Sequence, residues 1–243
     1  MVKKENEQFL CSVEGETEEW YFHYLQKIVN DRLNQLNANF TISIIPKICS
    51  PKKFMKTYPR LSSSTLCFHV FDYDNDKKRF IAILDEMHEA KKQKGIQYKM
   101  GYTNLSFELW MILHKINFNK SLLYPANYLA PIKKAFDISI ESIDDYKKEK
   151  CFKGILNKIT LEDVYSAINR AEKIQLNREN VSTPNKQNGN GYKWYLDNPS
   201  LSIHGCIKMI MDFCLTKLNN QIKDENKILK KKGQSERPLL QKL

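Results

Sequence analysis

Acidic residues gather at three places where the sequence predicts the end of a β-strand. Four of them follow apolar runs directly or within a few residues: Glu14, Asp72, Asp74 and Glu108. The carboxyl ends of parallel strands meet at one edge of a sheet, so we expect these side chains to converge there. Carboxylates that lie close together raise one another's pKa unless a cation intervenes. Their oxygens suit hard divalent ions such as Mg²⁺ or Mn²⁺, and the pattern therefore predicts a metal site.

Each acid also has a purely structural explanation. Glu16, Glu18 and Glu19 lie in the first turn of an expected helix, where the helix dipole favours negative charge. Residues 74–76 could form only a polar turn and a helix cap. Glu108 also begins an expected helix, so the same dipole argument covers it. The coincidence of acids at three strand ends is what favours a metal site.

The elements that must position these acids alternate in the first half of the chain. We expect strands at residues 8–13, 40–48, 65–71 and 96–103, and helices at 17–37, from Ser50 onward, at 77–94 and at 106–115. Strands separated by helices need crossover connections, which imply parallel pairing with helices on the sheet faces. Residues 1–118 are therefore predicted to form an open, mainly parallel α/β sheet flanked by helices.

The second half of the chain, residues 119–243, reads as an α-helical region without strands. Helical patterns cover 125–136, 161–177 and 200–232, and a mobile loop rich in Asn and Gly is expected at about 180–199. An aromatic cluster in that loop, residues 192–195, could stack on bases or anchor the loop to the core. A basic tail at about 223–243 could be a solvated helix end or an arm that binds nucleic acid.

Composition narrows the class of protein. The 243 residues include 39 Lys and Arg against 28 Asp and Glu, and the net charge of +11 favours a polyanionic partner such as nucleic acid, nucleotide or an anionic lipid surface. The apolar stretches are too short to span a bilayer, and the charged N-terminus does not resemble a signal peptide. The six cysteines form no CxxC pair, which predicts reduced thiols in a cytoplasmic protein and no zinc site.

Three segments together resemble a known family. Residues 13–18, 70–75 and 104–114 are similar to the RloB family, which is related to the lactococcal abortive-infection component AbiL and belongs among the Toprim-fold proteins. Toprim proteins carry a Glu-Gly after the first strand, matched by Glu14, and an Asp-x-Asp after the third, matched by Asp72 and Asp74. The family block Asn-Pro-x-Phe-Glu-Leu-Trp is matched by 104–110, except that Leu105 replaces the proline. The resemblance extends over about residues 8–218.

The resemblance implies a Toprim-like fold and a Mg²⁺- or Mn²⁺-dependent nuclease in anti-phage defence. Its substrate would be DNA or RNA, including tRNA. Its partner would be an ABC/AAA-type ATPase. Phosphodiester hydrolysis suits the acids, because two cations can activate water and stabilise the leaving oxygen. Asp72, Asp74 and Glu108 are then expected metal ligands, with Glu14 a ligand or the general base. Lys208 is the candidate cation for stabilising developing phosphorane charge.

Two other functions fit the same residues. The protein could be a non-catalytic binding module that docks on a partner ATPase or on nucleic acid, or it could transfer nucleotides from nucleoside triphosphates. No P-loop motif occurs in the sequence, so any ATPase must be a separate chain. The sequence does not decide between RNA and DNA as the substrate or between a monomer and a homo-oligomer, and it does not identify the trigger.

Overall fold

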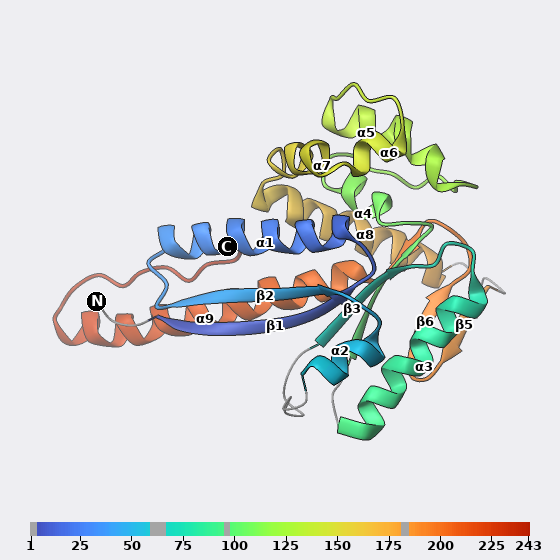
Figure 1. Ribbon diagram of the computed structural model, residues 1–243. Coiled ribbons are helices and arrows are strands. Elements are labelled where there is room, and N and C mark those ends of the chain that lie inside the picture. Colours follow the sequence, from blue (N-terminus) through green and yellow to red (C-terminus); the bar gives the residue numbers. More distant parts are fainter. Residues whose placement is uncertain (1–3, 59–66, 95–97, 181–184) are drawn as a thin grey trace.

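A five-stranded sheet forms the centre of the protein. The computed structural model describes residues 4–58, 67–94, 98–180 and 185–243. The strands β1 (Glu5–Val13), β2 (Phe40–Ile48), β3 (Cys67–Asp72), β4 (Tyr98–Asn104) and β7 (Ser200–Leu201) lie in the order β2-β1-β3-β4-β7 (Figure 1). The first four pair in parallel, and β7 is antiparallel to β4. This mainly parallel α/β sheet flanked by helices confirms the predicted fold class.

Helical crossovers explain the parallel pairing. The helices α1 (Glu16–Gln35), α2 (Pro51–Thr57) and α3 (Lys77–Lys94) each connect two strands. Ser50 caps α2 as expected, because its side chain accepts a hydrogen bond from the Lys53 N–H at 3.5 Å. Residues 9–13 of β1 are all buried, as in a central strand covered on both faces, whereas β2 at the edge alternates between buried and half-buried.

The two faces of the sheet carry separate cores. Phe68 and Val70 pack with α1, α4 (Glu108–Leu113), α8 (Leu161–Asn180) and α9 (Ile203–Lys231). Cys67 and Phe71 pack on the other face, with α2, α3 and the hairpin of β5 (Lys186–Gly189) and β6 (Tyr192–Tyr195). Successive side chains of a strand point to opposite faces. The side chains of consecutive residues at the strand ends therefore point toward opposite faces of the sheet.

Four short helices stand over the start of α1. They are η1 (Pro125–Tyr128), α5 (Leu129–Phe136), α6 (Ile143–Lys147) and α7 (Glu149–Leu156). The last three are labelled at the top of Figure 1. Phe152 of α7 lies 5.8 Å from Trp20 of α1, ring centroid to centroid. Their buried side chains continue the core of the α1 face. This packing brings α6 close to the end of the sheet where the predicted acids lie.

The expectation that residues 119–243 contain no strand is wrong. β5 and β6 pair around Asn190 and Gly191, whose φ angles of 54° and 85° suit a tight two-residue hairpin turn. Trp194 and Tyr195 are buried, so the aromatic cluster anchors this segment to the core. β7 adds a further strand to the main sheet. Residues 181–184 of the expected loop lie outside the described residues.

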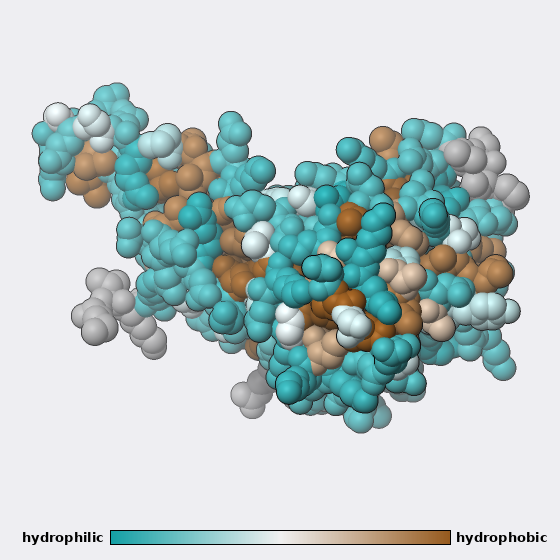
Figure 2. All heavy atoms as spheres, turned by 90° about the horizontal axis from the view of Figure 1, so that it is seen from above, coloured by the Kyte–Doolittle hydropathy of each residue, from teal (hydrophilic) through white to brown (hydrophobic). Residues whose placement is uncertain are grey.

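The end of the chain folds back along α9. After Lys231 the backbone reverses, and the Leu240 N–H and C=O both bond to the Asn219 side chain at 2.9 Å. Leu243 is buried and its N–H donates to the Tyr165 hydroxyl at 3.0 Å. Within the described residues no helix has the length and apolar character that crossing a membrane requires. Figure 2 shows a surface that is mostly hydrophilic on the side viewed there.

Candidate metal centre

Three of the predicted acids meet at the end of the sheet. Glu14, Asp72 and Asp74 each offer a carboxylate oxygen, and these oxygens all lie within 4.8 Å of one another. The Asp72 N–H donates a hydrogen bond to Glu14 Oε2 at 2.9 Å, which joins the ends of β1 and β3. We call these three residues the carboxylate cluster. The convergence predicted from the strand ends holds for these residues.

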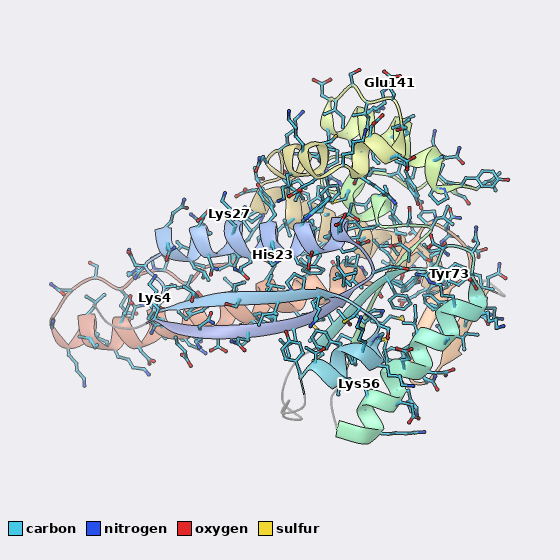
Figure 3. All side chains as sticks on the ribbon, in the orientation of Figure 1. Lys4, His23, Lys27, Lys56, Tyr73 and Glu141 are labelled. Carbon is cyan, nitrogen blue, oxygen red and sulfur yellow. The ribbon has the colours of Figure 1, made fainter. Side chains whose placement is uncertain are left out.

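Strand alternation explains how Asp72 is placed, but not Asp74. Asp72 follows Phe68 and Val70 by steps of two, so its side chain starts toward the α1 face. The chain then turns, because Asp74 and Asn75 adopt left-handed φ angles of 50° and 57°. Tyr73, labelled in Figure 3 near the start of α3, packs on the opposite face against Phe80. Asp74 therefore reaches the cluster through this turn, and not through the alternation of an extended strand.

Arg79 supplies positive charge to the cluster. Its guanidinium forms ion pairs with the carboxylates of Glu14 and Asp74, the latter at 3.1 Å. Asp76 caps the start of α3 by accepting the Arg79 N–H at 2.9 Å, as the sequence predicts for that residue. Burial lowers the pKa of Arg79, although the group stays charged at neutral pH. One positive charge thus pairs with two of the three clustered carboxylates and offsets part of their negative charge.

A deeper set of acids lies behind the cluster. Glu108 and Glu18 are 1% and 4% exposed, and Ser106 Oγ donates to Glu108 Oε2 at 2.6 Å. Thr103 Oγ1 donates a short hydrogen bond to Asp72. Burial, and then the charges of Glu18 and Glu108, raise the pKa of Asp72 well above its usual range. Glu108 is therefore a buried neighbour that interacts with Asp72, and not one of the three residues of the carboxylate cluster.

Glu18 is a site residue that sequence reasoning missed. The helix-dipole explanation does not account for its burial, or for the way burial and Glu108 raise its pKa. A signal was present in the helix pattern. Glu18, Tyr21, Phe22 and Leu25 are all buried, and their spacing places Glu18 on the apolar face of α1. An acid on the core-facing stripe of a helix needs a partner or an ion, which the dipole argument overlooks.

Lys147 of α6 is the lysine that the structure brings to these acids. Its Nζ lies 3.4 Å from Glu108 Oε1, and its side chain remains 45% exposed. Partial burial lowers the pKa of Lys147, but the carboxylates of Glu108 and Asp72 raise it by more, so the net shift is upward. The neighbouring Tyr146 is fully buried, and its hydroxyl has no hydrogen-bond partner among the described residues.

Lys208 lies elsewhere, so the prediction that it serves this site is wrong. Its Nζ pairs with Glu172 Oε1 of α8 at 2.5 Å, on an exposed surface. Lys147 occupies the position that Lys208 was expected to fill. No pattern in the sequence favours Lys147, because its approach depends on how the short helices pack over α1.

The acids open onto a cavity of about 320 Å³. It is lined by Glu14, Gly15, Glu16, Thr17, Glu18, Asp72, Asp74, Ser106, Pro125 and Lys147. Oxygen ligands of this kind suit a hard divalent cation. The pairing of Arg79 with two of the carboxylates is in keeping with such a site, because clustered carboxylates need a compensating positive charge. The donor set of the carboxylate cluster therefore fits a divalent metal ion.

Fold and site together define an open α/β protein with an acidic, metal-type centre at the carboxyl edge of its sheet. Residues 9–210 match the model of a family described as RloB-like protein, and the chain belongs to that family. No curated protein and no solved structure matches the chain. The resemblance to the RloB family drawn from the three short segments is thereby confirmed.

Proposed function

We propose that the protein is a Toprim-like nuclease that uses Mg²⁺ or Mn²⁺ to hydrolyse phosphodiester bonds of RNA or DNA. The observation that carries this proposal is the meeting of Glu14, Asp72 and Asp74, with ligand oxygens within 4.8 Å, beside a solvent-open cavity. Two basic side chains also lie at the site: Lys147 lines the cavity, and Arg79 pairs with Glu14 and Asp74. Such positive charges are what a phosphate group needs. As an RloB-like protein of the AbiL type, it would act as a toxic effector in anti-phage defence.

The carboxylate cluster would hold the metal. A bound divalent ion supplies Lewis-acid polarisation of the phosphoryl group and a water of lowered pKa. We assign Glu14 as a ligand and not as the general base, because a carboxylate that pairs with Arg79 and accepts the Asp72 N–H is a poor proton acceptor. Glu108, held by Ser106 and Lys147, orients the lysine that faces the same cavity.

Two basic side chains would act on the phosphate. Lys147 Nζ is positioned to stabilise negative charge on phosphoryl oxygens as it develops. If a metal neutralised the carboxylates, the Arg79 side chain would pair with a phosphate instead, since a guanidinium pairs well with either anion.

The charge of the whole chain supports a nucleic-acid substrate. A net charge of +11 attracts a polyanion over long range and makes its binding dependent on salt. RNA, including tRNA, and DNA both remain candidates. A cytoplasmic location and a partner ATPase of the ABC/AAA type complete the proposal, and both rest on the family resemblance. Self-association into a homo-oligomer is left to direct measurement.

A cleavage assay with paired variants tests the proposal. Purified protein is incubated with RNA and with DNA in Mg²⁺, in Mn²⁺ and in EDTA. Asp72→Asn and Glu14→Gln should abolish metal-dependent cleavage, while Glu19→Gln, a first-turn acid outside the cavity lining, should cut normally. Cleavage that survives both cluster substitutions would show that the carboxylate cluster is not the catalytic site.

One observation favours the alternative of a non-catalytic binding module. Arg79 already forms ion pairs with Glu14 and Asp74, and these ion pairs could be a permanent structural link. In that case nucleic acid or the ATPase would still bind to Asp72→Asn and Glu14→Gln, and no cleavage would occur with either metal. Labelled nucleoside triphosphates in the same assay detect nucleotidyl transfer, which would give extended products instead of hydrolysed ones.

A further inference from the structure

A second cavity adjoins the carboxylate cluster on the α3 side. Its volume is about 390 Å³, and it lies between the strand ends and α3. It is lined by Val13, Glu14, Ile48, Cys49, Ser50, His69, Phe71, Arg79, Ala82, Ile83 and Glu86. Glu14 lines both cavities, and Arg79 of this one pairs with Asp74 of the other. A single ligand could therefore extend from one cavity to the other across Glu14 and Arg79.

The lining is apolar with a few polar groups, which is typical of sites for small molecules. Phe71 and His69 stack, with ring centroids 4.9 Å apart and planes inclined by 25°. A flat, uncharged ligand suits such walls, whereas the acidic cavity on the α1 side suits a divalent cation and, through that cation, a phosphate. The two cavities thus differ in chemistry in the same way as the two parts of a nucleotide.

His69 gives this cavity a defined hydrogen-bonding group. The imidazole is 3% exposed, and its Nδ1 lies 2.7 Å from Ser12 Oγ. Ser12 Oγ also lies 3.4 Å from the Phe68 carbonyl oxygen, and the tautomer of the ring decides which partner donates in the shorter bond. In either tautomer Nε2, the other ring nitrogen, can donate or accept a hydrogen bond with a ligand in the cavity that His69 lines. Burial lowers the pKa of His69 to about 3, which keeps the ring neutral.

We infer that the second cavity, which we call the base cavity, receives the nucleobase of a nucleoside phosphate whose phosphate lies against Arg79 and the carboxylate cluster. The ring would lie beside Phe71 and His69, and a polar group on the base edge would form a hydrogen bond with His69 Nε2. Every nucleobase carries both donors and acceptors on its edges. The placement of the phosphate rests on the proposed function, but the binding of the base does not require cleavage.

Binding in Mg²⁺ tests the inference without any cleavage step, because these probes contain no phosphodiester bond. The probes are AMP, CMP, GMP and UMP, with inorganic phosphate as the reference. Ala82→Trp should fill the base cavity from an exposed position on α3, and Ile81→Trp places the same side chain one residue away, outside the lining. Ala82→Trp should weaken binding of the monophosphates about tenfold or more, in keeping with the loss of base stacking. It should leave phosphate binding unchanged, and Ile81→Trp should bind like the natural chain.

A second measurement needs no variant. The ¹⁵N resonances of the His69 ring report its tautomer and hydrogen bonding, and Nε2 should shift on titration with AMP but not with phosphate. The inference is overturned if the monophosphates bind no tighter than phosphate, if Ala82→Trp and Ile81→Trp bind them equally, or if the His69 resonances do not move.

Two further experiments distinguish a base within a strand from a free nucleotide, and the base cavity from the proposed nuclease. A trinucleotide that shows the same loss with Ala82→Trp identifies a base within a strand, whereas a trinucleotide that does not bind identifies a free nucleotide. Failure of cleavage with intact monophosphate binding would refute the nuclease and leave the base cavity standing. Cleavage with an unchanged KM in Ala82→Trp would refute the base cavity and leave the nuclease standing.

Discussion

The Glu14 carboxylate accepts a hydrogen bond from the backbone N–H of Asp72 at 2.9 Å. The bond crosses from the end of β1 to the end of β3, which are neighbouring strands. Glu14 therefore has two tasks, since it contributes charge to the carboxylate cluster and also fixes the backbone that carries the next acid. These two tasks can be separated by substitution.

Glu14→Gln and Glu14→Ala both remove the charge, but only Glu14→Gln keeps an oxygen that can accept the Asp72 N–H. We expect both variants to bind Mn²⁺ much more weakly than the natural chain in a calorimetric titration. Glu14→Ala should be less stable than Glu14→Gln by about 1 kcal/mol of unfolding free energy, the value of one such hydrogen bond. Equal urea midpoints for the two variants would show that the bond does not stabilise the fold.

Arg79 should compete with metal for the carboxylate cluster. Arg79→Gln removes the guanidinium that pairs with Glu14 and Asp74. These groups are about one-third exposed, so their pairing is worth about 1 kcal/mol or less, and Mn²⁺ should bind up to about fivefold more tightly to the variant. The matched control is Lys78→Gln, which removes a neighbouring charge. Weaker Mn²⁺ binding in Arg79→Gln would mean that the arginine supports the metal and does not compete with it.

Lys147 should affect turnover more than substrate binding. Lys147→Met removes the ammonium that lies 3.4 Å from Glu108, and we expect kcat to fall by about 10²–10³-fold with a small change in KM. Lys148→Met is the control, because Lys148 is exposed and pairs with Asp145, away from the cavity. If the two substitutions lower kcat equally, Lys147 has no particular role in the reaction.

The strand ends could be predicted from the sequence because they obey local rules. Apolar runs interrupted by helices imply parallel strands, and parallel strands bring their carboxyl ends together, which placed Glu14 and Asp72 correctly. The Asn190–Gly191 hairpin also had a local signal, a dipeptide that tolerates positive φ. The signal is weak because the residues before the turn, Lys186–Gly189, are polar and do not alternate like a buried strand.

The cations of the site could not be predicted in the same way. Arg79 is one of several basic residues at the start of α3, and only the turn at Asp74 and Asn75 aims that helix at the cluster. Lys147 reaches Glu108 from a five-residue helix whose position depends on packing over α1. Long-range packing of this kind leaves no periodic trace in the sequence. The lysine predicted from the sequence, Lys208, therefore lies elsewhere.

His114 should make the stability of the fold depend on pH, independently of the metal site. The imidazole is 1% exposed, donates from Nδ1 to the Trp110 carbonyl at 3.0 Å and faces the Tyr21 hydroxyl with Nε2 at 3.1 Å. Burial lowers its pKa to about 4, from an ordinary value of 6.5. Between these values the unfolded chain binds the proton and the folded chain does not, so stability must fall as the pH drops. The full shift corresponds to about 3 kcal/mol of unfolding free energy.

The measurement is urea unfolding of the natural chain and of His114→Asn at several pH values from 7 to 4. Asparagine can place its amide N–H where Nδ1 lies, but it does not titrate. Asp and Glu residues also titrate in this range, so the quantity to compare is the difference between the two proteins. We expect that difference to shift in favour of His114→Asn by about 3 kcal/mol between pH 7 and pH 4, whatever the absolute cost of the substitution. Parallel curves would mean that the His114 ring takes up its proton equally well in the folded and unfolded chain, because any such difference in affinity must change the slope.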